Sequence, residues 1–165
     1  WLVSQGVSDP DRLAVYGSSF GGHAAVSAAA EAPELFAAAI GYAGVYNWLD
    51  EIDDEFKEEP VYAALKKRTY YGDYDNERNK WLEASALSKV DRIACPVLLV
   101  HGRSDTTVSS MQSRRMHKAL KKAGKDSRLK LLSFNRHGLA QEKPRIDFYV
   151  QLAAFLDEAL PAEKR

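Results

Sequence analysis

A serine enclosed by glycines lies near the start of the chain, in the stretch VYGSSFGGH at residues 15–23. The pentapeptide GSSFG fits the pattern G-x-S-x-G, in which a sharp turn from a strand into a helix exposes a nucleophilic serine. Gly17 and Gly21 flank Ser19 two residues away on either side, where the turn needs small residues. If Ser18 were the nucleophile, the turn would need small residues at positions 16 and 20, where tyrosine and phenylalanine stand. We therefore predict that Ser19 is a nucleophile, placed at a helix N-terminus that favours developing negative charge.

A glycine-rich turn between a strand and a helix can also bind phosphate, so the motif alone leaves two interpretations. The stretch GSSFGG lacks the Lys-Ser/Thr ending of a nucleotide-binding P-loop and the glycine spacing of a dinucleotide fingerprint. This difference favours the nucleophile.

A serine nucleophile needs a base, and the base needs a carboxylate that orients it. In the chain order that accompanies this motif, the acid follows a later strand and the histidine follows the last one. Asp105 lies just after the apolar run PVLLV, and His137 lies in the loop FNRHGL before the last helical pattern. The other histidines, His23, His101 and His117, lie on predicted helices or at a strand end, and we expect structural roles for them.

Four apolar runs alternate with helical patterns and predict strands at 13–16, 36–44, 96–100 and 129–134. Amphipathic helices are predicted for 109–124 and for the C-terminal segment that carries Phe148 and Phe155. This alternation predicts an α/β fold with a parallel sheet covered on both faces, the fourth strand being the most edge-like. Asp91 and Asp126 precede strands, so they lie at the opposite end of the sheet from the predicted acid.

Residues 47–92 interrupt this alternation with a polar, aromatic-rich segment that we expect to be helical in pieces. It could form a lid or a pocket wall, or a solvated connection, and for its acidic run at 50–59 we favour the solvated face. At the start of the chain, Trp1, Leu2 and Val3 are typical of the tail of an amphipathic helix that Gly6 ends. We therefore expect the sequence to be a piece of a longer protein.

The composition limits the partners that this chain can have. Its 23 Lys and Arg residues balance 23 Asp and Glu residues, which argues against nucleic acid or an anionic membrane as a partner. No apolar run approaches the roughly 20 residues of a membrane span. The single Cys95 cannot form an internal disulfide. We expect no cofactor and no metal.

Together these segments resemble the catalytic domain of the prolyl oligopeptidase family, which are serine peptidases with an α/β-hydrolase fold. The resemblance runs from residue 1 to about residue 160. It includes WLVSQGVSDPDRLAVYGSSFGGHAA around the serine, YYGDYDNERNKWLEASALSKVDRIACPVLLVHGRSDTTV leading to the aspartate, and RHGL at the histidine. The dipeptidyl-aminopeptidase and acylaminoacyl-peptidase branches are the most similar.

The resemblance implies a role for each site residue. Ser19 would be the nucleophile, Asp105 the orienting acid and His137 the general base, and the backbone N–H of Phe20 would donate to the oxyanion. The substrate would be a peptide.

The resemblance also implies where the substrate side chain would bind. In the dipeptidyl-peptidase branch, residues just after the second strand line the pocket for the side chain before the scissile bond. The matching residues are Val45 and Trp48. Ordinary core packing is an equally good interpretation of these two residues.

Residues 1–165 would then be the C-terminal portion of a hydrolase domain, without its early strands and without the family's N-terminal β-propeller. The absent hydrolase portion normally supplies the second oxyanion donor, so we expect the chain alone to be weakly active. We also expect self-association through the exposed edge of the first strand, or disorder at residues 1–16. Two alternatives remain at this stage: a carboxylesterase or lipase with the same triad, and a hydrolase-like module without catalysis.

Overall fold

The computed structural model describes residues 1–58, 60–61, 65, 76–133 and 136–160. Its α-helices include α1 (Phe20–Glu31), α2 (Trp48–Glu58), α4 (Arg78–Ala84), α5 (Met111–Lys122) and α6 (Glu142–Ala159). Its strands are β1 (Ala14–Ser18), β2 (Ala38–Tyr42), β3 (Val97–Gly102) and β4 (Ser127–Leu132), and two 3₁₀-helices are η1 (Pro10–Arg12) and η2 (Ala86–Arg92).

The four strands form one parallel sheet in the order β1-β2-β3-β4. The central strands β2 and β3 are buried along their whole length, as their continuous apolar runs predict. β4 is an edge strand and is fully buried only at Ser127 and Leu132. The prediction of four parallel strands with an edge-like fourth strand is confirmed. The predicted end of this strand at residue 134 lies outside the described residues.

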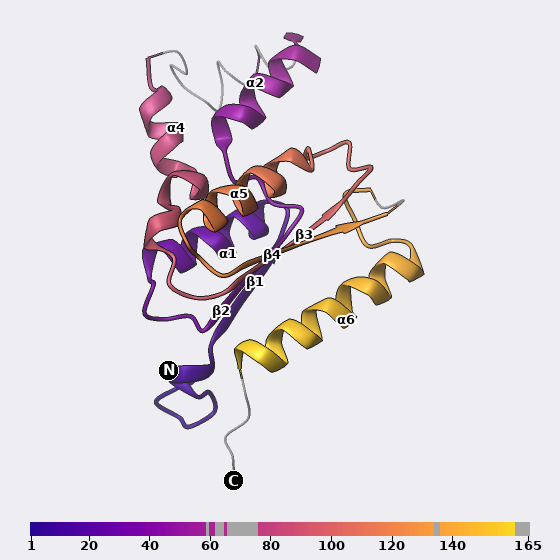
Figure 1. The fold of residues 1–165 in the computed structure, drawn as a ribbon. Helices are drawn as coiled ribbons and strands as arrows, with labels where there is room; N and C mark the ends of the chain where they lie inside the picture. Colours follow the sequence, from indigo (N-terminus) through magenta and orange to yellow (C-terminus); the bar gives the residue numbers. More distant parts are fainter. Residues whose placement is uncertain (59, 62–64, 66–75, 134–135, 161–165) are drawn as a thin grey trace.

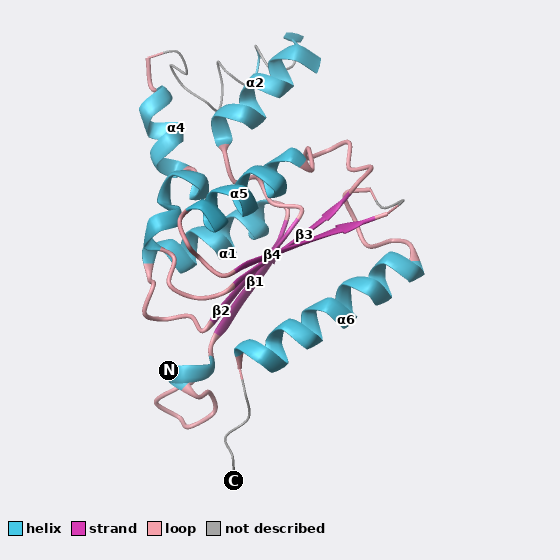
Figure 2. Ribbon diagram, viewed as in Figure 1, coloured by secondary structure: helices cyan, strands magenta, loops and turns pink. Residues whose placement is uncertain are grey.

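Helices cover both faces of the sheet, with α1 and α5 on one face and α6 on the other (Figures 1 and 2). One core cluster lies beneath α1 and α5, where Val26 and Met116 pack with Leu99. A second lies beneath α6, where Phe148 and Phe155 are almost fully buried. The small residues of α1 let that helix lie close to the sheet, because an alanine side chain adds little thickness.

Where the sequence predicts the tail of a helix, the structure has one hydrogen-bonded turn at residues 2–6, in which the Gln5 N–H donates to the Trp1 carbonyl at 3.0 Å. Gly6 has φ +68° and ends this turn, as predicted. The Val7 N–H donates to the Leu2 carbonyl at 3.0 Å, and the Gly6 N–H donates to the Val3 carbonyl at 3.0 Å. This hydrogen-bond pair is the Schellman arrangement that ends helices. It closes a turn whose apolar side chains stay exposed, and Trp1 is 84% exposed.

The segment between β2 and β3 is helical in pieces, as predicted, where the structure describes it. α2, α4 and η2 come from this segment, and α2 and α4 lie beyond α1 and α5 on the same side of the sheet (Figure 1). Among the described helices, none is long and apolar enough to cross a membrane. The fold thus places three loops at one end of the sheet: the turn after β1, the loop after β3 and the loop after β4.

Candidate active site

The turn between β1 and α1 holds Ser19 in an unusual backbone conformation. Its φ is 57° and its ψ is −123°, a region that a serine occupies only under strain. The Ser19 N–H donates to the Tyr42 carbonyl of β2 at 2.8 Å, and the Ser19 carbonyl accepts from the Gly22 N–H at 2.9 Å. These bonds hold the serine at the N-terminus of α1, with its side chain directed out of the turn.

The glycines around this turn are not equally necessary. A Cβ at Gly17 would lie 1.9 Å from the Gly21 carbonyl oxygen, so only glycine fits there. A Cβ at Gly22 would lie 2.9 Å from the Tyr42 carbonyl oxygen, which is also too close. A Cβ at Gly21 would meet nothing within 4 Å. The expectation that both glycines of the motif are sterically required is therefore wrong for Gly21. The second position at which a side chain would clash is Gly22.

The structure brings Ser19, His137 and Asp105 into one chain of hydrogen bonds. His137 Nε2 lies 2.9 Å from Ser19 Oγ, and His137 Nδ1 lies 2.9 Å from Asp105 Oδ2. Because a carboxylate only accepts, Nδ1 carries the proton, and Nε2 is left to accept from the serine hydroxyl. The imidazole is 27% exposed, whereas the Asp105 side chain is fully buried.

The carboxylate of Asp105 has donors on both oxygens. Oδ1 accepts from the backbone N–H groups of Thr107 at 2.9 Å and Val108 at 3.0 Å. Burial alone would raise the pKa of this carboxyl, but the donors around it outweigh burial and hold its pKa well below the usual range. In order of decreasing effect these donors are His101, the Val108 N–H, His137 and the Thr107 N–H. The acid is therefore charged wherever the protein is folded at ordinary pH.

Phe20 follows the serine and is the first residue of α1, so its N–H points out of the helix end without an intrahelical acceptor. Its ring is 66% exposed and lies 6.1 Å from the ring of Trp48 and 5.7 Å from that of His23. Trp48 also contacts Trp81 of α4, with ring centroids 6.3 Å apart. An aromatic cluster thus lies directly beside the serine.

The two residues predicted to line a substrate pocket lie in different surroundings. Trp48 is half-buried within the aromatic cluster, whereas Val45 is only 5% exposed. Trp48 Nε1–H donates to His23 Nε2 at 3.4 Å. Burial lowers the pKa of His23 and outweighs the Val45 carbonyl, which raises it, so the ring is kept neutral and able to accept. His23 thus helps to fix the position of Trp48.

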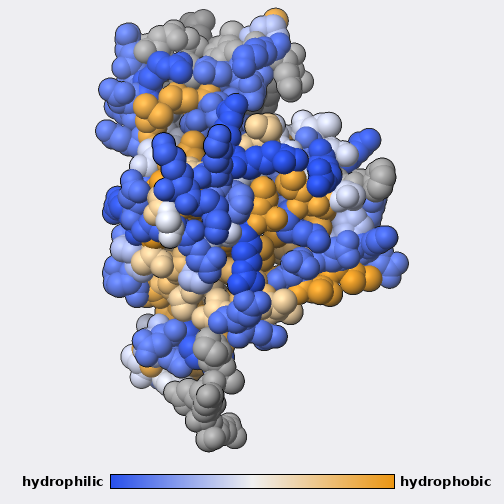
Figure 3. Space-filling model, viewed as in Figure 1, coloured by the Kyte–Doolittle hydropathy of each residue, from blue (hydrophilic) through white to orange (hydrophobic). Residues whose placement is uncertain are grey.

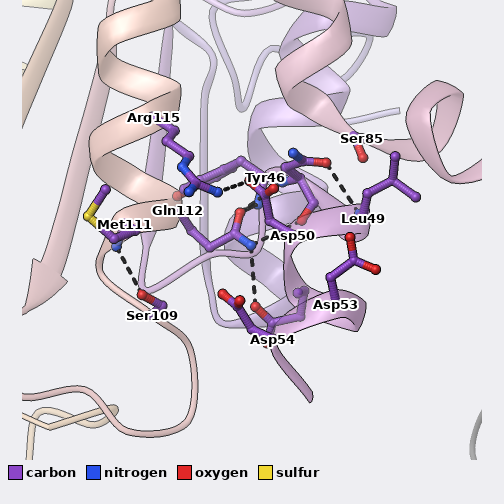
Figure 4. A network of polar contacts seen from close by, with 12 residues as sticks. Tyr46, Leu49, Asp50, Asp53, Asp54, Ser85, Ser109, Met111, Gln112 and Arg115 are labelled. Atoms are coloured by element: carbon purple, nitrogen blue, oxygen red, sulfur yellow. Dashed lines mark hydrogen bonds and ion pairs between the residues drawn. The ribbon is translucent and has the colours of Figure 1, made fainter. Parts of the chain in front are cut away.

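Gln112 of α5 ties the loop before α2 to the rest of the domain (Figure 4). Its Oε1 accepts from the N–H groups of Tyr46 at 3.0 Å and Asn47 at 2.9 Å. Its Nε2 donates to the Asn47 carbonyl at 3.0 Å and to Glu51 Oε2 at 3.3 Å. Beside this network, Arg115 pairs with Asp50. A hollow of about 460 Å³ there is lined by Asp50, Arg115 and their neighbours but by none of the three residues of the hydrogen-bonded chain.

Sequence patterns missed three of these residues. His23 and His101, for which we expect structural roles, contact Trp48 and Asp105. Gln112 carries no motif, and its partners lie 61 to 66 residues away. Among the described residues, no group of three or more His, Cys, Asp or Glu converges as a set of metal ligands.

The parallel sheet, the strained serine turn and the loops after β3 and β4 define an α/β-hydrolase fold. A puromycin-hydrolysing peptidase of Mycobacterium tuberculosis has the same fold, with a TM-score of 0.85 and 28% identity over 98% of this chain and 24% of that one. An acylaminoacyl peptidase structure superposes with a TM-score of 0.84 at 23% identity over 99% of this chain and 26% of that one. The chain belongs to the prolyl oligopeptidase family, whose profile matches residues 1–163.

Curated relatives agree with this assignment. A probable chloroplastic glutamyl endopeptidase of Oryza sativa subsp. japonica is 32% identical over 83% of this chain and 14% of its own length. Dipeptidyl aminopeptidase BIII of Pseudoxanthomonas mexicana is 29% identical over 97% of this chain and 23% of its own length. The chain therefore spans less than a quarter of the length of either relative.

Proposed function

We propose that this chain carries the nucleophile, the acid and the base of a serine peptidase that cleaves short peptides through an acyl-enzyme. The observation that supports this most directly is the hydrogen-bonded series of Ser19 Oγ, His137 and Asp105 Oδ2, with 2.9 Å at each step. A serine becomes a nucleophile when a correctly oriented neutral imidazole can take its proton. The buried, charged carboxylate holds the imidazole in the tautomer that this step needs.

In the first step the Ser19 oxygen attacks the carbonyl carbon of the substrate, and its proton passes to His137 Nε2. Asp105 remains ionised and stabilises the imidazolium that forms. The carbonyl oxygen becomes an oxyanion at the N-terminus of α1, where we expect the N–H of Phe20, the first residue of that helix, to donate to it.

In the second step the tetrahedral intermediate collapses. The C–N bond breaks, and the leaving amine takes the proton from His137. A water molecule then attacks the acyl-enzyme while His137 accepts its proton, and Ser19 leaves with that proton. The leaving amine thus carries away the proton that came from Ser19, and a proton from water replaces it on the serine, so the chain is regenerated.

For the substrate we propose a short peptide whose side chain before the scissile bond contacts the aromatic cluster of Phe20, Trp48 and Trp81. Val45, the other residue predicted to line this pocket, is nearly buried. The names of two similar proteins, a dipeptidyl aminopeptidase and a puromycin-hydrolysing peptidase, support a small peptide or peptide-like amide as the substrate.

We further propose that residues 1–165 form part of one hydrolase domain and that the second oxyanion donor comes from outside them. Loss of one such donor typically costs about 10²–10³ in rate. The chain by itself would then react at Ser19 but turn over peptides slowly.

A fluorophosphonate probe tests the nucleophile, because it reacts only with an activated serine. We expect labelling of the 165-residue chain at Ser19, identified by peptide mass spectrometry, and no labelling of Ser19→Ala. Ser18→Ala is the matched control, and its labelling rate should stay within about twofold, as for other surface substitutions. Equal labelling of Ser19→Ala would sink the proposed nucleophile.

Turnover tests the substrate class and the missing donor. We expect the chain to hydrolyse an activated ester slowly and a dipeptide anilide more slowly still. Peptide turnover equal to that of an intact family member would contradict the proposal that an oxyanion donor is missing.

A further inference from the structure

A second imidazole, that of His101, lies behind the carboxylate of Asp105. His101 belongs to β3 and is completely buried. Its Nε2 lies 3.3 Å from Asp105 Oδ2 and 3.0 Å from the Val108 carbonyl oxygen, and its Nδ1 lies 2.7 Å from Ser113 Oγ. The acid is thus held between two histidines, of which the proposed reaction uses only His137.

The partners of His101 determine its tautomer. Both groups that face Nε2 are acceptors, so Nε2 must carry a proton that they share. A serine hydroxyl can donate or accept, and in the neutral ring the Ser113 hydroxyl therefore donates to Nδ1. This gives His101 the opposite tautomer from His137, whose proton is on Nδ1.

We propose that His101 is a positioning residue that aims the acid at the base, an inference that rests on the proposed function. Its Nε2–H reaches both Asp105 and the Val108 carbonyl, so one donor ties together the two ends of the turn at 105–108. The Thr107 and Val108 N–H groups hold Oδ1. With His101 on Oδ2 as well, the carboxylate cannot rotate, and Oδ2 stays directed at His137.

The chain contains a matched control for this interaction. His117 of α5 also pairs with a serine, since its Nδ1 lies 2.9 Å from Ser127 Oγ, but neither residue contacts the proposed triad. A substitution at His117 therefore removes the same kind of His–Ser pair without touching the acid.

The first test measures the rate of fluorophosphonate labelling at Ser19 in the 165-residue chain. His101→Leu removes the donor, and we expect labelling to slow about 10- to 100-fold, as for a small misplacement of a catalytic group. His101→Gln can place an amide N–H near the position of Nε2, so it should recover most of the rate. His117→Leu should leave the rate unchanged.

The second test is independent of reactivity. Long-range ¹H–¹⁵N spectra of the chain with ¹⁵N-labelled histidine should show His101 as the Nε2–H tautomer. They should also show the His137 Nδ1–H proton far downfield, and this resonance should move or broaden in His101→Leu and return in His101→Gln.

The outcomes separate this inference from the proposed function. If even the unmodified chain fails to label, the proposed function of the chain fails, while the tautomer of His101 and the His137 resonance still decide the positioning role. An Nδ1–H tautomer at His101 overturns the inference. So does a His101→Leu chain with unchanged labelling and an unchanged His137 resonance. If His101→Leu does not fold, the positioning role is decided by the tautomer of His101 and by the His101→Gln chain. A folded His101→Gln chain that has lost all fluorophosphonate labelling contradicts the positioning role.

Discussion

Two residues other than glycine have a positive φ in the part of the chain that the structure describes: Ser19 at 57° and Ala43 at 48°. Both lie at the carboxyl ends of neighbouring strands. The Ser19 N–H donates to the Tyr42 carbonyl, and the Ala43 N–H donates to the Val100 carbonyl, each at 2.8 Å. Such conformations cost on the order of 1–3 kcal/mol each and persist only where the surroundings impose them. The strain is therefore concentrated at the sheet end that carries the proposed triad.

Asp105 should make the stability of the chain depend on pH. Its pKa in the folded state is below the usual value of about 3.9. Its stabilising contribution is therefore complete above about pH 4 and is lost as the pH falls further, through the folded-state pKa. Chemical denaturation of Asp105→Asn at neutral pH should show a free energy of unfolding lower by about 1–3 kcal/mol, because a charged acceptor is lost.

The difference in the free energy of unfolding between Asp105→Asn and the unmodified chain should shrink as the pH falls below about 4. In that range the unfolded state of the unmodified chain takes up a proton that the folded state does not, until the carboxyl is neutral in both states. The control is Asp126→Asn, whose side chain is exposed at the opposite end of the sheet. The free energy of unfolding of Asp126→Asn should differ little from that of the unmodified chain at neutral pH. A constant difference between Asp105→Asn and the unmodified chain across this pH range would rule out the assigned role of the carboxylate.

At the scale of the elements, local patterns predicted the strands and the helices around the sheet. Apolar runs identify buried strands whatever their neighbours. The rule that acid and base follow later strands pointed to Asp105 and His137, and the fold brings both side chains to the sheet end at which Ser19 lies. The contacts of Gln112 and His101 could not be predicted in this way. Those of Gln112 depend on how α5 packs against the loop after β2. Those of His101 depend on how the loop after β3 folds back onto its own strand. The open space at Gly21 is likewise a three-dimensional property of the turn.

Gln112 joins α5 to the loop that begins α2, so its loss should loosen that loop. Gln112→Leu leaves the buried N–H of Tyr46 and the partly buried N–H of Asn47 without their acceptor. We expect a free energy of unfolding lower by about 2–4 kcal/mol, since each lost partner costs about 1–3 kcal/mol. The emission of Trp48, which begins α2, should shift to the red as water reaches it.

Denaturant unfolding and tryptophan fluorescence measure these two effects. Gln141→Leu is the control, because Gln141 is exposed and its side chain makes no capping hydrogen bond at α6. It should change the stability by less than about 0.5 kcal/mol. If Gln112→Leu has the same free energy of unfolding and the same tryptophan emission as Gln141→Leu, the hydrogen bonds of Gln112 do not hold the loop.

At the scale of the whole molecule, apolar surface remains uncovered. It gathers between α5 and α6, where the sheet edge reaches the surface, and along the outer side of α6 (Figure 3). On α6, Ile146 is 53% exposed, Tyr149 56% and Val150 57%. Exposed apolar surface of this kind is typical of faces that pack against further protein.

β1 is the other uncovered feature, and it leads to a prediction about association. In the described structure this strand pairs with β2 on one side only, along Ala14–Ser18. Its sequence AVYGS contains neither a charge nor a proline, the residues that usually protect an edge strand. We therefore expect the 165-residue chain to self-associate through β1, with the average mass in sedimentation equilibrium rising with concentration.

Tyr16 provides the test, because its side chain is 50% exposed on this strand. Tyr16→Lys places a charge on the edge and should weaken association about tenfold or more, since like charges would meet across a β1–β1 pair. Val61→Lys removes an exposed apolar side chain from a different element, 85% exposed, and should leave association unchanged. A chain that sediments as a monomer at every concentration would contradict pairing through β1. Equal weakening by both substitutions would point to general apolar contact instead, because only a strand-edge interface makes the charge at Tyr16 matter more than the charge at Val61.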